Sequence, residues 1–314
     1  MLADMKDRHT APLVAALSVV LVWGLNFPLQ KALFGQVGPV GFLGLRYLLV
    51  PFCAVALLCW RFGTRWPRLD RIEVWPLVRL TLIGQGLHLL LSALGMQGST
   101  AFSASVLLAC GPVFTLLILR LSGVEKLSRG QVAGVVTAAT GALLFTSDKL
   151  LAAGWHAGLG DLTLLAAAAL FSYYTVASKP LIQHHGGVTV LAYGSLICTL
   201  PMLLWCAPAL ASLDWQAQPA WVWSGTVWQT AGGGFIGWLA WGWANEQRGV
   251  ARTAPLIYLM PLIAGLTAWA WGGEQFSAHK LLGAGVILAG VALAQFSPSL
   301  RVLRARPRPP EPSC

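Results

Sequence analysis

The sequence predicts an all-α integral membrane protein with ten transmembrane helices, arranged as two inverted five-helix repeats. Three observations predict this fold class. Hydrophobic residues make up 56% of the 314 residues and the mean hydropathy is +0.68, which is more apolar surface than a water-soluble globule can cover. Apolar runs of about 20 residues, long enough to cross a bilayer, recur along the chain. The second half of the chain also repeats residue types of the first half at a nearly constant offset.

The apolar runs are taken in order along the chain. Because strand-like alternation is missing and the connections are short, helices rather than a barrel satisfy the backbone inside the bilayer. The first run contains Trp23, Asn26 and Pro28 and lacks a small-residue cleavage site, so we interpret it as a retained helix and not as a signal peptide. The ten predicted spans are Pro12–Phe34, Val40–Trp60, Trp75–Met96, Phe102–Leu121, Gln131–Phe145, Leu159–Pro180, Val188–Ala209, Trp221–Trp243, Thr253–Trp271 and Leu281–Phe296.

The spans divide the chain into segments without a separate soluble domain. Residues 1–11 form a cytoplasmic N-terminus and residues 12–146 the first repeat. Residues 147–158 are a linker, and residues 159–296 form the second repeat. Residues 297–314 are basic and rich in proline, which is typical of a disordered cytoplasmic tail.

The net charge of +10 is distributed as in a membrane protein. With the N-terminus inside the cell, sixteen of the 21 lysines and arginines fall in cytoplasmic segments, whereas the outer connections hold only Lys31, Lys149 and Lys280. Connections rich in Lys and Arg stay in the cytoplasm. The sequence therefore predicts a multi-pass protein with both termini cytoplasmic. No nucleic-acid partner is predicted, because no aromatic or fold context accompanies the basic tail.

The internal repeat has an offset of 149 residues, or 148 near the front of each half. An odd number of helices per repeat forces the second copy to enter the membrane from the opposite side. Inverted repeats of this kind place a substrate near the midplane at their interface and give alternating access. The residue pairs that match are Pro112 with Pro261, Gly123 with Gly272, Glu125 with Glu274, Ser128 with Ser277, Gly134 with Gly283 and Gly141 with Gly290.

Several repeated residues have a structural interpretation. We expect the two glutamates to stabilise helix ends rather than to carry protons, because each precedes a serine-led helix. The glycines recur at spacings that allow close helix packing. Proline removes a backbone donor, so three prolines are candidate hinges, namely Pro28, Pro112 and Pro261.

The motifs WGLNFPLQKAL at 23–33, GLRYLLVPF at 44–52, GPVFTLLI with GVEKLSRGQVAG, and LMPLIAGLTAWAWGGEQFSAHKLLGAGVILAG together resemble the EamA type of the drug/metabolite transporter superfamily over residues 12–296. The resemblance implies a permease of the bacterial inner membrane, often an exporter of amino acids or related metabolites. The first span holds no Asp or Glu, so the proton-coupling carboxylate of the small multidrug relatives cannot be transferred to this chain.

Polar side chains at membrane depth indicate where a substrate binds, because lipid offers them no partner. Trp23, Asn26 and Gln30 share one helix face. The matching residues of the second repeat are Phe171, Tyr174 and Ser178, and the third span carries Gln85 and His88. Both stripes are candidate cavity linings, with helix-to-helix hydrogen bonding as the alternative. His88 is a candidate proton carrier, although a hydrogen-bonded structural histidine is the alternative.

Three further residues complete the predicted substrate site. Arg46 lies six residues inside the second span, and a guanidinium suits a substrate carboxylate. The alternative is that Arg46 extends toward the interface. Trp238 and Trp241 share a stripe of the eighth span below three glycines. The sequence thus predicts a secondary transporter that works by alternating access, with a small-molecule substrate and the lipid bilayer as partners. The resemblance implies that it exports amino acids or related metabolites.

Several alternatives stay open at this point. An uptake permease and a multidrug exporter are alternatives within the same class. An integral-membrane enzyme would need a nucleophile with its base or clustered metal ligands, and the spans show neither. No catalytic residue, cofactor or metal site is predicted, and no ATP-binding GxxxxGK[ST] motif occurs. The protein is expected to be a monomer or a homodimer.

Overall fold

The structure is a computed structural model and describes residues 2–123, 125–153, 155–248, 253–297 and 300–301. It describes the backbone alone for residues 2–9, 125–126, 146–153, 155–157, 254–255 and 300–301. Most of the predicted tail 297–314 and most side chains of the predicted linker 147–158 therefore lie outside the described residues. The side chains of residues 2–9 and that of Glu125 lie outside them as well.

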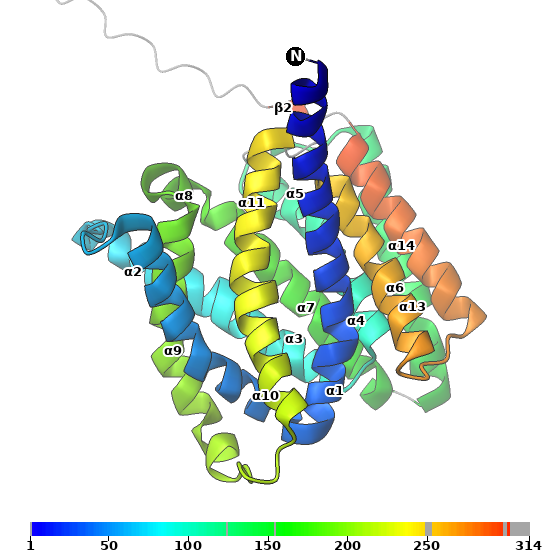
Figure 1. The fold of residues 1–314 in the computed structure, drawn as a ribbon. Helices are drawn as coiled ribbons and strands as arrows, with labels where there is room; N and C mark the ends of the chain where they lie inside the picture. Colours follow the sequence, from blue (N-terminus) through cyan, green and yellow to red (C-terminus); the bar gives the residue numbers. More distant parts are fainter. Residues whose placement is uncertain (1, 124, 154, 249–252, 298–299, 302–314) are drawn as a thin grey trace, which may run out of the picture.

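The first half of the chain contains seven helical segments and one short strand (Figure 1). They are α1 (Leu2–Phe62), α2 (Arg71–Thr81), the π-helix η1 (Leu82–Leu87), α3 (His88–Gln97), α4 (Ala101–Leu108), α5 (Gly111–Leu121), β1 (Glu125–Lys126) and α6 (Arg129–Ala153).

The second half follows the same plan, with the short helix α8 added between two spans. Its elements are α7 (Trp155–Ala177), α8 (Lys179–His185), α9 (Gly187–Ala211), α10 (Ala220–Val227), the π-helix η2 (Trp228–Ile236), α11 (Gly237–Arg248), the 3₁₀ helix η3 (Ala254–Leu259), α13 (Met260–Ala270), α14 (Ala278–Phe296) and β2 (Leu300–Arg301). The two strands pair antiparallel, with Glu125 opposite Arg301, and join the segment before α6 to the segment after α14.

The prediction of an all-α membrane protein with ten spans is confirmed. Among the described residues, six helical stretches are long and apolar enough to cross a bilayer, and one of them, Thr10–Phe62, holds two spans. The other three spans are α6, the α10–η2–α11 stretch and η3–α13. The first two spans meet at Gly38, whose φ of 69° and ψ of 164° interrupt the helical path of α1. A positive φ favours glycine because it has no Cβ.

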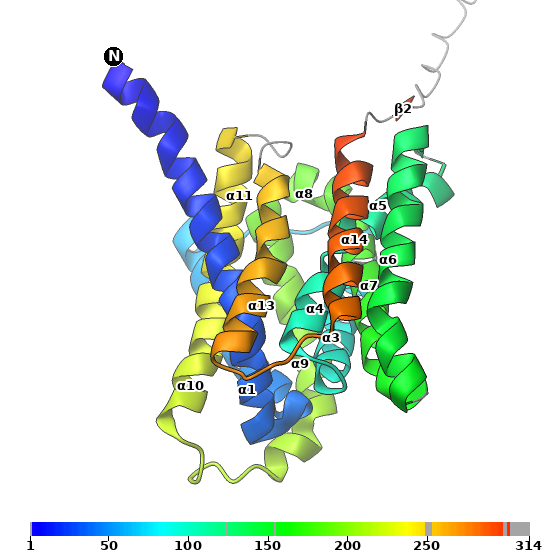
Figure 2. The ribbon, with the colours of Figure 1, turned by 90° about the vertical axis from the view of Figure 1, so that its right-hand side faces the viewer.

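The contact between α6 and α14 shows directly that the repeats are inverted. These two helices are equivalent under the 149-residue offset, and they pack side by side and antiparallel (Figure 2). A Cβ at Gly134 would lie 2.3 Å from the Ala294 nitrogen, and a Cβ at Gly283 would lie 2.6 Å from the Phe145 nitrogen. These two contacts correspond to each other under the offset. Glycine permits this close approach, as the sequence predicts.

The segment before α14 lies at the opposite end of the bundle from β1 and the N-terminus (Figure 2). There Glu274 accepts a hydrogen bond from the Phe102 nitrogen at 3.4 Å, in the first turn of α4. Its other oxygen contacts Lys280 Nζ at 3.4 Å. Glu274 therefore stabilises a helix start, as expected, although the helix is α4 and not α14. Lys280 is the third residue of α14 and is 5% exposed, rather than part of an outer connection.

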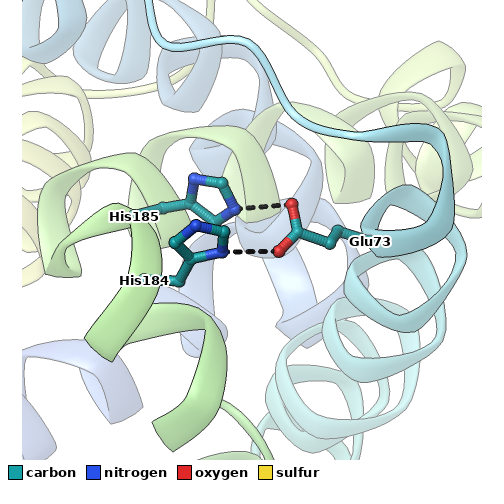
Figure 3. Close-up of side chains that lie close together, drawn as sticks. All are labelled: Glu73, His184 and His185. Atoms are coloured by element: carbon teal, nitrogen blue, oxygen red, sulfur yellow. Dashed lines mark hydrogen bonds and ion pairs between the residues drawn. The ribbon is translucent and has the colours of Figure 1, made fainter.

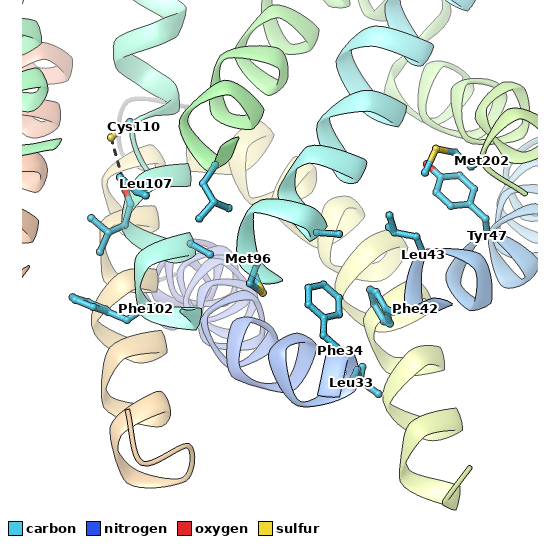
Figure 4. Close-up of a cluster of buried hydrophobic side chains, with 14 of the residues drawn as sticks. Leu33, Phe34, Phe42, Leu43, Tyr47, Met96, Phe102, Leu107, Cys110 and Met202 are labelled. Atoms are coloured by element: carbon cyan, nitrogen blue, oxygen red, sulfur yellow. Dashed lines mark hydrogen bonds between the residues drawn. The ribbon is translucent and has the colours of Figure 1, made fainter. Parts of the chain in front are cut away.

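Part of the main buried cluster lies where α1 reverses at Gly38. Figure 4 shows Leu33, Phe34, Phe42 and Met96 together in this cluster, with Tyr47 further along α1. The rings of Phe34 and Phe42 lie 5.6 Å apart across the break at Gly38. Because lipid is as apolar as leucine, this packing stabilises the bundle through close contact and not through removal from water.

Candidate functional site

A cavity of about 560 Å³ lies between the two repeats. The first repeat lines it with the second half of α1, with η1 and with the start of α3. The second repeat lines it with α7, α8, α9, η2 and α11. A volume of about 300–1,000 Å³ is typical of small-molecule sites. The position between the repeats agrees with the position that inverted repeats predict.

The cavity reaches one end of the bundle only. Its lining includes Trp60, Arg61, Gly187 and Glu246, which lie at helix ends on the side of the N-terminus. At the other end the lining stops at mid-span residues. Tyr47 belongs both to this lining and to the buried cluster of Phe42 and Met96. The cluster therefore closes the cavity on the side remote from the N-terminus.

The closed end of the cavity is polar. Gln85 Nε2 donates a hydrogen bond to Ser195 Oγ at 3.3 Å, which joins η1 to α9. Within the described part of the chain, three buried atoms of lining residues have no hydrogen-bond partner: Arg46 Nε, Tyr47 OH and Gln85 Oε1. Leaving such a group unpaired costs about 1–3 kcal/mol. Two hydrogen-bond donors and one acceptor of the lining residues therefore lack a partner among the described residues in this conformation.

Both π-helices border this polar end. η1 contributes Gly84 and Gln85, and η2 contributes Gly234 and Phe235. Gly84 and Gly233 correspond to each other under the 149-residue offset. A Cβ at Gly234 would lie 3.4 Å from Arg46 Nη2, so this glycine lets the guanidinium approach the backbone of η2. Such interruptions of α-helices frequently occur at functional sites.

Aromatic rings form one wall of the cavity. His88 and Phe171 lie 5.1 Å apart between ring centroids, and Phe171 and Trp238 lie 6.0 Å apart. Tyr174 lines the same wall, next to Gly84 of η1. His88 Nδ1 lies 2.8 Å from the Ala167 carbonyl oxygen, so the ring donates a hydrogen bond there. This bond connects α3 to α7 and fixes the orientation of the imidazole.

The structure brings six of the predicted substrate-site residues together around the cavity, and five others lie outside its lining. The six are Arg46, Gln85, His88, Phe171, Tyr174 and Trp238. The five are Trp23, Asn26, Gln30, Ser178 and Trp241.

Hydrogen bonds and ring packing account for most of these five. Trp23 Nε1 donates to the Gly233 carbonyl oxygen at 2.9 Å, and its ring lies 5.6 Å from that of Trp241. The backbone carbonyl oxygen of Asn26 accepts a hydrogen bond from Gln229 Nε2 at 2.8 Å, whereas the side-chain Oδ1 of Asn26 is buried without a hydrogen-bond partner in the part of the chain that the structure describes. Trp23 and Asn26 thus hold η2 against α1 directly behind the cavity. Gln30 is half-buried on α1, and Ser178 is buried between α7 and α8.

The predicted hinge prolines differ in their surroundings. Pro112 is the second residue of α5, directly after the break that separates α5 from α4. Pro261 is the second residue of α13, directly after the 3₁₀ helix η3. Pro28 lies inside the continuous first part of α1. The two equivalent prolines therefore mark equivalent helix breaks.

Sequence reasoning missed several lining residues. Tyr47, Ser195 and Glu246 were not singled out, because a single tyrosine, serine or helix-end glutamate has no distinctive pattern. The glycines of η1 and η2 did leave a signal. GQG at 84–86 and GGG at 232–234 occur at corresponding places in the two repeats.

Comparisons with known proteins agree with this architecture. A model of the EamA-like transporter family matches residues 10–147 and again residues 158–296. A protein of Streptantibioticus cattleyicolor named "Probable terminal-alkyne amino-acid exporter" is 30% identical over 281 residues, covering 89% of this chain and 91% of that protein. A Salmonella typhimurium protein named "Probable amino-acid metabolite efflux pump" is 29% identical, covering 90% and 93% of the two chains. A crystal structure at 18% identity matches the fold with a TM-score of 0.62 over 91% of this chain.

Proposed function

Because the chain belongs to the EamA-like transporter family, it is a membrane transporter and not an enzyme, and we propose that it exports an amino acid or a related small metabolite across the bacterial inner membrane. The cavity between the inverted repeats supports transport by alternating access. The names of the relatives from Streptantibioticus cattleyicolor and Salmonella typhimurium support export of an amino acid or its metabolite. Because the cavity lies within one chain, one protomer suffices for this function.

The orientation follows from the distribution of positive charge. Most lysines and arginines outside the spans fall on the side of the N-terminus, and this asymmetry supports a cytoplasmic location for that side. The mouth of the cavity, at Trp60, Arg61 and Glu246, then faces the cytoplasm. This conformation is an inward-open state, which is the state that receives a solute for export.

The observation that carries the proposal is the set of unpaired polar atoms at the closed end of the cavity. Arg46 Nε and Tyr47 OH are donors that fit a carboxylate, and a charge-assisted bond to a guanidinium is among the stronger hydrogen bonds. Gln85 Oε1 is an acceptor that fits an ammonium group. The rings of Phe171 and Trp238 offer apolar contact to a side chain. The arrangement therefore fits an amino acid with an apolar side chain.

Release on the outer side requires the buried cluster of Leu33, Phe34, Phe42 and Met96 to separate. Such a rearrangement disturbs the fewest regular backbone hydrogen bonds at the places where the helices of both repeats are already irregular. They are η1 and η2 beside the cavity, and the breaks before Pro112 and Pro261. Their equivalent positions fit an exchange of conformations between the two repeats.

The proposal is tested by counterflow in proteoliposomes with radiolabelled amino acids. We expect an apolar amino acid to exchange, whereas its methyl ester and the corresponding amine do not compete, because both lack the carboxylate. Arg46→Gln should raise the KM about 10- to 100-fold, the value of a hydrogen bond to a charged group. Arg79→Gln is the matched control, because Arg79 is exposed on α2 and does not line the cavity.

Equal KM values for the Arg46→Gln and Arg79→Gln variants would contradict the placement of the carboxylate. Exchange of the ester and the amine at the rate of the amino acid would contradict the substrate class. The direction of transport is measured separately, in cells loaded with the exchanged amino acid. Faster efflux from cells that produce the protein supports export, and net accumulation of external amino acid would assign uptake instead.

A further inference from the structure

Three potential metal ligands meet beside the mouth of the cavity. Glu73 lies in the first turn of α2, and His184 and His185 are the last two residues of α8. Figure 3 shows both imidazole rings facing the same carboxylate. His184 Nδ1 lies 2.8 Å from Glu73 Oε1, and His185 Nε2 lies 2.7 Å from Glu73 Oε2. A carboxylate only accepts hydrogen bonds, so both rings donate to it.

Two features show that the three side chains converge in an unusual way. Consecutive residues of a helix do not face each other, yet these two imidazoles lie 4.3 Å apart between ring centroids and reach one carboxylate. The end of α8 makes this possible, because Gly186 follows at once with a φ of 81°. Glu73 is also held in place, since Glu73 Oε2 accepts a hydrogen bond from the Asp70 nitrogen at 3.4 Å.

The donor atoms suit a divalent transition metal. One ligand atom from each of the three residues can be chosen so that all of them lie within 4.8 Å of one another. Zn²⁺ binds nitrogen and oxygen ligands at about 2.0–2.2 Å in a tetrahedron, which puts the ligand atoms about 3.3 Å apart. Small rotations of the three side chains bring their ligand atoms to this spacing. Because the His184 side chain is 64% exposed, water can occupy a fourth position, as it does in open zinc sites.

We propose that Glu73, His184 and His185 form a binding site for Zn²⁺ at the mouth of the cavity. The metal displaces the proton of each ring nitrogen that now faces the carboxylate. His184 then binds through Nδ1 with its N–H on Nε2, and His185 binds through Nε2 with its N–H on Nδ1. The displaced proton moves to the other nitrogen of a neutral ring, or leaves an imidazolium for water. No electron transfer is involved, and two imidazoles with one carboxylate are a ligand set that suits Zn²⁺.

Binding at this place joins the two repeats. Glu73 belongs to the first repeat, and α8 belongs to the second, where Ile182 of α8 and Gly187 at the start of α9 line the mouth of the cavity. A bound metal therefore restrains α8 against α2 and opposes any change of conformation that separates them. We expect Zn²⁺ to inhibit transport, and this consequence rests on the proposed function, whereas metal binding itself does not.

Binding is measured on the chelator-treated, full-length protein in detergent, after removal of any affinity tag. Calorimetry with Zn²⁺ should give one site per chain with a Kd in the micromolar range or below. Glu73→Gln and His184→Gln should each weaken binding at least about tenfold, because each removes one of three ligands. His279→Gln is the matched control, since His279 is an exposed histidine at the start of α14, at the opposite end of the bundle.

A second variant separates ligation from a structural effect. His184→Cys replaces one ligand type of Zn²⁺ by another. With Co²⁺ as the probe, it should restore binding and add a thiolate-to-cobalt charge-transfer band that the wild type lacks. The proposal is overturned if the wild type binds Zn²⁺ no more tightly than the Glu73→Gln variant, or if the His184→Cys variant shows no such band.

The regulatory consequence is read in the counterflow assay. Zn²⁺ should slow exchange by the wild type and by the His279→Gln variant, and it should have little effect on the His184→Gln variant. If Zn²⁺ binds tightly but affects the wild type and the His184→Gln variant equally, the inhibitory role is overturned. The metal site itself would still stand. If no amino acid exchanges in the wild type, the proposed function fails, and the binding measurements still decide the metal site.

Discussion

The close contact between α6 and α14 allows a stability prediction whose magnitude follows from measured distances. A Cβ at Gly290 would lie 2.3 Å from the Ala138 nitrogen and 2.8 Å from the Gly134 carbonyl oxygen. Both neighbours are backbone atoms, which cannot rotate away as a side chain could. Ordinary contact starts at 3.4 Å, so Gly290→Ala forces the helices about 1 Å apart, and overpacking of this kind costs about 1–3 kcal/mol.

Gly285 provides a matched control in the same helix. A Cβ at Gly285 meets no atom within 4 Å. Alanine favours a helix over glycine by up to about 1 kcal/mol, and this gain is common to both variants. The difference in stability between Gly290→Ala and Gly285→Ala therefore isolates the contact, and we expect it to be about 1–3 kcal/mol in disfavour of Gly290→Ala.

The assay is thermal unfolding of the purified variants in detergent, followed by size-exclusion chromatography of the remaining folded protein. At about 2–4 °C per kcal/mol, the apparent Tm of Gly290→Ala should lie about 2–12 °C below that of Gly285→Ala. Gly141→Ala should behave like Gly290→Ala, because a Cβ at Gly141 would lie 2.5 Å from the Ile287 nitrogen in the equivalent contact. Equal Tm values for Gly290→Ala and Gly285→Ala would refute the close antiparallel packing.

Three further predictions concern the cavity and its surroundings. Tyr47→Phe removes an unpaired donor and should raise the KM for the amino acid about 3- to 10-fold with unchanged protein abundance; loss of abundance instead would indicate a structural role. His88→Gln should keep the pH dependence of counterflow, because the amide can still donate to the Ala167 oxygen; a flattened pH profile would make His88 the proton carrier. Trp23→Phe removes the hydrogen bond to Gly233 and should lower stability by about 1 kcal/mol, measured as the apparent Tm; a KM effect without a Tm change would place Trp23 in contact with substrate.

The predicted site residues separate into two groups for a physical reason. A spacing of three and four residues places side chains on one face of a helix, but it does not say which way that face turns in the bundle. The stripe of Trp23 and Asn26 faces η2, where Trp23 Nε1 donates to the Gly233 carbonyl oxygen and the Asn26 side chain packs against Gly233. The equivalent stripe of Phe171 and Tyr174 faces the cavity. Equivalent residues of the two repeats thus have different surroundings in this conformation, which is what a two-state transporter requires.

The amino-acid sequence by itself determined the number of spans, the helical class and the inversion of the repeats. The class is helical because lipid offers no hydrogen-bond partner, so the backbone groups must bond to one another. The repeats are inverted because the 149-residue offset relates two halves that each have an odd number of helices. The close packing of α6 and α14 at Gly134 and Gly283 was also predictable from the sequence, because small residues at this spacing let membrane helices approach each other closely.

Only the tertiary structure decided which polar groups meet. The rotation of each helix in the bundle brought Arg46, Tyr47 and Gln85 to one closed end, and the π-helices η1 and η2 set the positions of the glycines around them. Likewise Glu73 and His184 are 111 residues apart in sequence and meet only because α8 lies against α2. Hydrophobic length is a property of each segment alone, whereas the pairing of polar side chains depends on the packing of all segments together.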